Sequence, residues 1–113
     1  MLDNQSAVPG VIRRYLDAHD KHHTEVALSA FAPDATVVDE DREFQGSDGV
    51  RQFLETAGAG FTYTRTFVAA QQLDASTWLV ENRLEGDFPG GVADLRYQFR
   101  LSDDLISELV IAP

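Results

Sequence analysis

Four stretches decide the fold of this chain: FTYTRTFVAAQQL (61–73), TWLVENRLEG (77–86), VADLRYQFRL (92–101) and LISELVIA (105–112). In the first three, apolar and polar residues alternate with a period of two, which is typical of β-strands with one buried face. Turn-forming segments separate the four stretches, at 74–76, 87–91 and 102–104. The pattern predicts consecutive antiparallel hairpins whose apolar face covers a single core.

The first half of the chain predicts helices instead. Pro9 suits the first turn of a helix, and one apolar face follows it at positions i, i+3, i+4 and i+7: Ile12, Tyr15, Leu16 and His19. A second, short helix is expected to begin at a Thr24 cap, to carry Val26, Ala27, Ala30 and Phe31, and to end before Pro33.

A short strand is expected at ATVVDED (35–41), followed by a third helix capped by Ser47. This helix would carry Val50, Phe53, Leu54 and Ala57 on one face and end at Gly58 and Gly60. Helices followed by a meander predict an α+β domain over residues 1–113, because both apolar faces are buried when they pack together. A strongly curved, mainly antiparallel sheet wrapped around three N-terminal helices gives a cone-shaped fold that can hold a pocket.

Composition narrows the possible functions. The 113 residues carry a net charge of −10, so phosphate backbones and anionic lipid would be repelled, and neither nucleic acid nor a membrane is expected as a partner. The absence of cysteine excludes disulfides, thiol catalysis and cysteine-bound metals. The start MLDNQSAVPG (1–10) lacks the basic and apolar regions of a secretory signal, which predicts a cytoplasmic protein.

Two segments resemble the nuclear transport factor 2-like superfamily, in its SnoaL-like and ketosteroid isomerase-like branch. The first, 11–40, combines an apolar-x-x-x-Tyr helix with AFAPDATVVD (30–39), and FQGSDGVRQFLE (44–55) resembles the branch's G-x-x-G/A-I/V-R-x-F segment. The resemblance covers residues 8–112 and implies the cone fold. It leaves the activity open, since this fold hosts isomerases, cyclases, dehydratases, epoxide hydrolases and non-catalytic binders.

The ketosteroid isomerase pattern implies catalytic roles for particular positions. Tyr15 stands where that enzyme's helical tyrosine donates to the substrate oxyanion, and Asp39 stands where its base moves the proton. A second aspartic acid of that enzyme precedes an x-Phe-Arg segment, where this chain has Tyr97 in YQFR (97–100). Asp94 falls on the opposite face by parity, so the third catalytic group is changed and Tyr97 is the candidate second donor.

Alternation supports Asp39 independently of the resemblance. Val37, Asp39 and Asp41 share one face of the predicted strand, so an inward Asp39 would be a carboxylate in an apolar pocket. Desolvation and the neighbouring acids would raise its pKa, which suits a general base near neutral pH. The alternative is a solvated aspartate at the end of a strand.

The remaining candidates would bind the substrate. His19 follows Tyr15 by one turn and either lines the pocket or acts as an acid–base group. Arg65 shares parity with Tyr63, so it either points inward to pair with Asp39 or is turned outward by a bulge. The other candidate wall residues are Phe31, Phe53, Tyr63, Trp78, Asn82 and Phe99.

No metal and no cofactor are expected. His19 and His23 are four residues apart, as two ligands on one helix face would be, but a break is predicted between them and no third ligand is placed by spacing.

We therefore expect a small-molecule enzyme that transfers a proton next to a carbonyl, an isomerase or a cyclase, on a small apolar or ring-containing substrate. The alternatives are a non-catalytic ligand-binding dimer and a protein-interaction module that uses the outer sheet face. That face alternates charges at Glu81, Arg83, Glu85, Arg96, Gln98 and Arg100, which predicts cross-strand pairs. The family resemblance implies that the same face forms a homodimer.

Overall fold

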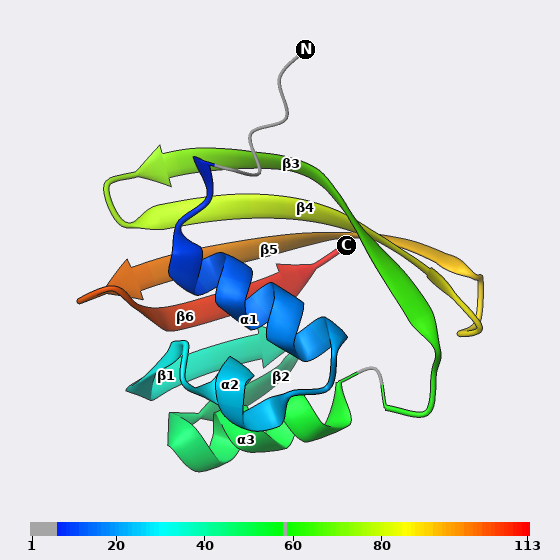
Figure 1. The fold of residues 1–113 in the computed structure, drawn as a ribbon, viewed down its shortest axis with the longest axis horizontal. Helices are drawn as coiled ribbons and strands as arrows, with labels where there is room; N and C mark the ends of the chain where they lie inside the picture. The colour runs from blue at the N-terminus through cyan, green and yellow to red at the C-terminus, as the bar shows by residue number, and fades with distance from the viewer. Residues whose placement is uncertain (1–6, 58) are drawn as a thin grey trace.

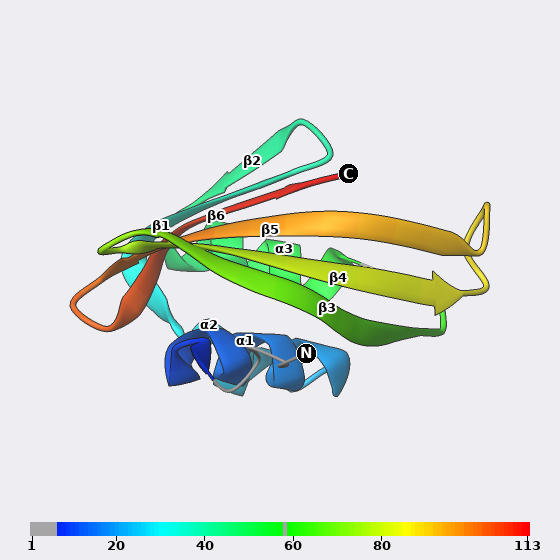
Figure 2. The same ribbon diagram turned by 90° about the horizontal axis from the view of Figure 1, so that it is seen from above.

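Three helices lie against one face of a curved six-stranded sheet (Figures 1 and 2). The computed structural model describes residues 7–57 and 59–113. The helices are α1 (Gly10–Asp20), α2 (Thr24–Leu28) and α3 (Gly46–Thr56). The strands are β1 (Phe31–Asp39), β2 (Arg42–Gln45), β3 (Tyr63–Asp74), β4 (Thr77–Gly86), β5 (Val92–Ser102) and β6 (Leu105–Ala112). The predicted α+β cone is confirmed.

The strands are ordered β2-β1-β6-β5-β4-β3 in the sheet. Strands β3 to β6 form consecutive antiparallel hairpins, as the alternation predicts. Strand β1 pairs in parallel with β6, and β2 folds back beside β1. The sequence pattern predicted neither feature. A parallel neighbour needs a long crossover, and here the whole segment between β1 and β6 supplies it.

The boundary between α2 and β1 corrects one prediction. The second helix ends at Leu28, and Phe31, assigned to that helix from the sequence, is the first residue of β1. The strand covers Phe31–Asp39 rather than 35–41, so Pro33 lies inside it. Pairing with β6 is interrupted between Phe31 and Thr36. The missing N–H of Pro33 therefore breaks no ladder hydrogen bond there.

The helix starts also differ from the predicted caps. Thr24 is the first residue of α2, with His23 at the N-cap, and α3 begins at Gly46 rather than after Ser47. The N-cap of α3 is Gln45, and neither helix has a side-chain capping hydrogen bond. The expectations that rest on Gly58 and on residues 1–6 lie outside the described residues.

A bulge in β3 sets the curvature of the sheet. The register with β4 shifts between Phe67 and Ala69, after Arg65 rather than before it. Arg65 therefore keeps the inward parity of Tyr63, and the sheet bends beyond it.

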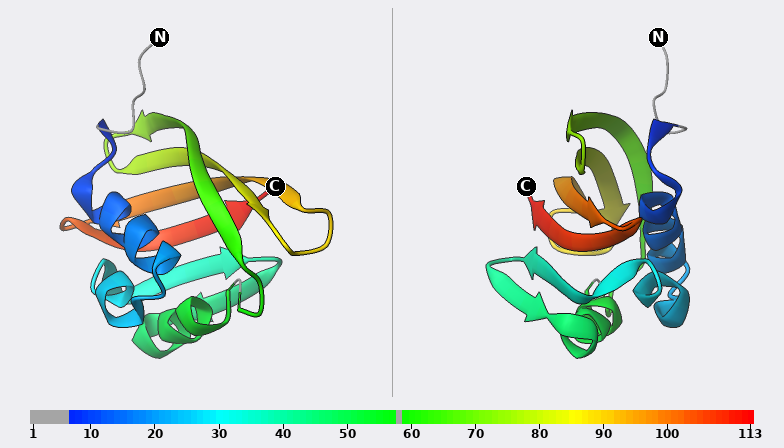
Figure 3. Two further views of the ribbon diagram at one scale, coloured as in Figure 1. Left: turned by 45° about the vertical axis from the view of Figure 1, so that its right-hand side comes forward. Right: turned by 90° about the vertical axis from the view of Figure 1, so that its left-hand side faces the viewer.

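Helix α1 lies against the concave face of the sheet (Figure 3), and its apolar side chains are buried there. Tyr15 is 0% exposed, and its ring meets those of Phe31 and Phe99 edge-on at centroid distances of 5.2 and 5.9 Å. Ile12 and Leu16 are buried on the same face. The outer face carries cross-strand ion pairs, as predicted: Arg96 pairs with Glu81, both named from the sequence, whereas Arg83 pairs with Asp94, which was not among the predicted partners. In the part of the chain that the structure describes, no helix is long and apolar enough to span a membrane.

Candidate active site

A cavity of about 710 Å³ opens at one end of the cone. It lies between the end of α1, the β1–β2 turn, the start of β3 and the β4–β5 hairpin, which Figure 1 shows gathered on its right-hand side. The lining residues are Tyr15, His19, Asp39, Glu40, Asp41, Phe53, Ala57, Phe61, Tyr63, Leu84, Phe88, Pro89, Ala93, Leu95, Tyr97, Ile111, Ala112 and Pro113.

The cavity exists because strands β4 and β5 extend beyond the end of α1, the helix that covers them. Figure 2 shows β4 and β5 extending past the end of α1. Where α1 covers the sheet, large inward side chains such as Val80 and Phe99 are completely buried. Beyond α1, the inward residues of β5 include Ala93, which lines the cavity and is too small to fill it.

Three phenols converge on this cavity. Burial raises the pKa of Tyr15 well above its usual value, and Tyr97, Tyr63 and Asp39 raise it further through unfavourable charge interactions. Burial likewise raises the pKa values of Tyr97 and Tyr63. All three phenols are therefore neutral at physiological pH and keep their O–H protons.

Asp39 lies at the end of β1 with its side chain at the cavity, as the strand parity predicts. Burial and then the charge of Glu40 raise the pKa of its carboxyl, and Arg42 opposes this weakly. The sequence-based expectation of a raised pKa for Asp39 agrees with this direction. The carboxylate is a stronger base here than in water.

His19 lines the same cavity, stacked on Tyr15 with ring centroids 5.7 Å apart. Its ring also lies 5.9 Å from that of Phe53. Burial lowers the pKa of the imidazole, with smaller opposing contributions from Asp20 and the backbone of Ala57. The ring is therefore neutral near pH 7. His22 and His23, by contrast, are exposed.

The structure places five predicted binding residues away from this cavity. Among the predicted wall residues only Phe53 and Tyr63 line it, together with His19. Phe31, Trp78, Asn82 and Phe99 lie where α1 covers the sheet, so they belong to the packed core or its edge. Arg65 points inward but ends beneath α1. Strand parity identified the inward face, whereas the position of α1 decided which part of that face stays open.

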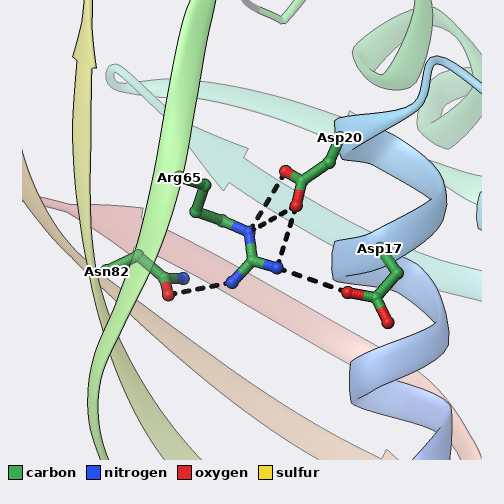
Figure 4. Close-up of polar contacts among 4 residues, drawn as sticks. All are labelled: Asp17, Asp20, Arg65 and Asn82. Atoms are coloured by element: carbon green, nitrogen blue, oxygen red, sulfur yellow. Dashed lines mark hydrogen bonds and ion pairs between the residues drawn. The ribbon is translucent and has the colours of Figure 1, made fainter.

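The predicted partner of Arg65 is wrong. Its guanidinium binds Asp20 of α1, with Nε 2.9 Å from one carboxylate oxygen and the terminal nitrogen also at 2.9 Å, and not Asp39 (Figure 4). Asp17 lies 3.5 Å away, and the other terminal nitrogen donates to Asn82 Oδ1 at 3.1 Å. The guanidinium therefore ties α1 to β3 and β4 rather than serving the cavity.

A model of the SnoaL-like domain matches residues 12–109. The chain belongs to the SnoaL-like domain family. No curated protein matches it significantly.

Solved structures agree with this family. The SnoaL-like chain is 29% identical to a candidate polyketide cyclase from Sinorhizobium meliloti, with 95% of this chain and 97% of that one covered and a TM-score of 0.87. A Catenulispora acidiphila protein with a ketosteroid isomerase-like fold, solved with trimethylamine, is 15% identical over 93% and 85% of the two chains, with a TM-score of 0.80. A Mycobacterium tuberculosis protein solved with estradiol-17β-hemisuccinate is 16% identical over 91% and 90%, with a TM-score of 0.75.

Several cavity residues of this SnoaL-like chain were not predicted from its sequence. Leu84, Leu95 and Ile111 have the inward parity of their strands, which was a usable signal. Glu40 and Asp41 form the two-residue turn between β1 and β2, and β2 itself was missed. Alternation in the predicted strand put Asp41 on the face of Asp39, but nothing in the pattern placed Glu40 at the cavity. Across residues 7–57 and 59–113, no group of three or more histidine, aspartate or glutamate side chains is placed to hold a metal ion.

Proposed function

We propose that this SnoaL-like chain catalyses proton transfer next to a carbonyl group of an apolar ring compound, as an isomerase or a cyclase. Asp39 is the base, and the phenols of Tyr15 and Tyr97 hold the developing oxyanion. The observation that carries the proposal is the presence of one half-buried carboxylate and these buried phenols on the wall of a single aromatic cavity.

The chemistry follows from these groups. The Asp39 carboxylate takes a proton from the carbon next to the carbonyl, and the C–H electron pair becomes the C=C bond of an enolate. The carbonyl π electrons move to oxygen, where the phenol O–H groups donate hydrogen bonds. An isomerase then returns the proton to a different carbon of the enolate. In a cyclase the enolate carbon instead attacks a second carbonyl and forms a C–C bond. The first carbonyl re-forms, the π electrons of the second move to its oxygen, and that oxygen takes the proton from the Asp39 carboxyl group.

The relatives support the class of reaction without naming a substrate. Two proteins of similar structure, from Sinorhizobium meliloti and Shewanella putrefaciens, are candidate polyketide cyclases. The Mycobacterium tuberculosis protein was solved in complex with a steroid ester, so a protein of this fold binds a polycyclic ligand. The cavity volume of about 710 Å³ is within the usual range for small-molecule sites.

Hydrogen–deuterium exchange tests the proposed step whatever the final product. Cyclic ketones such as 2-tetralone and a Δ5-3-ketosteroid are incubated with the protein in D2O, and deuterium next to the carbonyl is measured by mass spectrometry. Asp39→Asn is expected to slow exchange by about 10²–10⁴-fold, because a positioned base contributes that much. Tyr15→Phe and Tyr97→Phe are expected to slow it by about 10²–10³-fold each if both donate to the oxyanion.

Asp34→Asn is the matched control, since Asp34 is an exposed aspartate on the same strand and does not line the cavity. It is expected to exchange at the rate of the unaltered protein. An Asp39→Asn variant as fast as this control would remove Asp39 from the mechanism. Ketone binding without catalysed exchange by the unaltered protein would favour the non-catalytic ligand-binding alternative.

A further inference from the structure

The charged groups that face the cavity are all acidic. Asp39, Glu40 and Asp41 line it, and no lysine or arginine is among its lining residues. Arg42, the nearest basic residue in sequence, stacks its guanidinium over the Phe44 ring at 4.9 Å. The chain as a whole carries a net charge of −10.

Two further basic groups near the cavity wall do not offset these acids. Arg65 is already paired with Asp20, as Figure 4 shows. The imidazole of His19 is neutral near pH 7, because burial lowers its pKa. An anionic ligand would therefore meet several carboxylates and no lysine or arginine side chain among the lining residues.

The rest of the cavity wall is largely aromatic. Six rings line it, from Tyr15, Phe53, Phe61, Tyr63, Phe88 and Tyr97. Aromatic faces attract ammonium groups through their negative electrostatic potential, most strongly where water is excluded. The cavity thus combines the two kinds of group that recognise organic cations, carboxylates and aromatic rings.

Two of these rings lie at the mouth. Phe61 precedes β3 and leaves 43% of its surface exposed, and its ring meets that of Phe88 in the β4–β5 loop edge-on at 6.2 Å. Hydrogen bonds between Thr62 and Asp87 join the two segments, with N–O distances of 2.7 and 3.1 Å. The exposed ring contributes little to the core, and it is held in position beside the opening.

We infer that the ligand of this cavity carries a cationic amine on an apolar ring system. The ring system lies among the inner aromatic residues, and the ammonium group lies at the mouth near Glu40 and Asp41. This inference rests on the proposed function in taking the cavity as the ligand site, and it adds the charge of the ligand.

Three indoles that differ only in their side-chain group provide the binding test: tryptamine (cationic), tryptophol (neutral) and indole-3-acetate (anionic). Isothermal titration calorimetry at low salt is expected to give tryptamine a Kd at least about tenfold lower than that of tryptophol. Indole-3-acetate is expected to bind most weakly. The advantage of tryptamine should shrink in 0.5 M NaCl, since salt screens the carboxylates.

The chain offers a closely matched pair of double variants. Glu40 and Asp41 form a two-residue hairpin turn with φ of 52° and 63°, and Asp103 and Asp104 form another with φ of 51° and 64°. Asparagine tolerates this left-handed backbone. Glu40→Asn with Asp41→Asn, and Asp103→Asn with Asp104→Asn, thus remove the same charge from the same kind of turn. The second turn lies at the opposite end of the sheet (Figure 1).

The first double variant is expected to reduce the preference for tryptamine over tryptophol to about threefold or less, and the second to leave it nearly unchanged. Equal losses in both variants would trace the preference to overall charge and overturn the inference. Equal affinities of the three indoles, tighter binding of the anion, or no binding of any of them at millimolar concentration would also overturn it. These measurements need no turnover, so failure of the ketone exchange alone leaves the charge preference standing.

Discussion

Replacing Arg65 with methionine is expected to lower the free energy of unfolding by about 2–4 kcal/mol. The guanidinium is 8% exposed, although it holds a full charge, and its contacts join β3 to α1 and β4. Methionine keeps the apolar part of the side chain but removes every donor. Because α1 carries Tyr15 and His19, the same change should loosen the wall of the cavity.

The size of this expected loss follows from how exposed each partner of Arg65 is. The carboxylates of Asp20 and Asp17 are 34% and 66% exposed, so they regain water when the guanidinium is lost, and the ion pairs account for about 1 kcal/mol. Asn82 is 1% exposed and its Nδ2 already has no partner among the described residues. Losing the bond to Oδ1 leaves the whole amide unsatisfied, which costs about 1–3 kcal/mol.

Urea denaturation followed by circular dichroism measures this loss, with Arg83→Met as the control. Arg83 also pairs with an aspartate across elements, Asp94 at 2.8 Å, but both side chains are more than half exposed, so the expected cost is about 0–1 kcal/mol. In the Arg65→Met background, Asn82→Leu should restore about 1–2 kcal/mol, because the unpaired amide is removed. Equal costs for Arg65→Met and Arg83→Met, or no recovery with Asn82→Leu, would refute the reasoning.

Three further outcomes are expected. Because burial raises the pKa of Asp39, the charge of its carboxylate destabilises the fold at any pH above that pKa. Asp39→Asn should therefore raise the resistance to urea at pH 7.5. This gain should vanish below a pH of about 3.9, where the carboxyl group is protonated in both the folded and the unfolded protein. Gly86→Ala should cost about 1–3 kcal/mol in the same assay, because its Cβ would lie 2.3 Å from the Thr62 carbonyl oxygen, whereas Gly10→Ala, with nothing within 4 Å, should cost nothing. Sedimentation equilibrium is expected to give about twice the chain mass of 12.5 kDa for a homodimer, and a single-chain mass would contradict that expectation.

Local patterns in the sequence determined most of the elements and their buried faces. The stripe of Ile12, Tyr15 and Leu16 predicts the buried side of α1, and alternation predicts the inward residues of β4 and β5. These predictions succeed because a helix face or a strand face depends on residues two to four positions apart. The placement of Asp39 and Tyr15 in one site needed the family resemblance as well.

Contacts between distant segments decided the rest. Arg65 pairs with Asp20, 45 positions away, and β1 lies parallel to β6. No pattern of neighbouring residues could predict either contact, because the partners are far apart in the sequence. The cavity depends on where α1 stops relative to the ends of β4 and β5, which places Glu40 and Asp41 at its mouth and leaves Phe99 in the packed core. The sequence by itself determined which side chains face inward, whereas the tertiary structure decided which of them remain uncovered, since covering a side chain takes a partner from elsewhere in the chain.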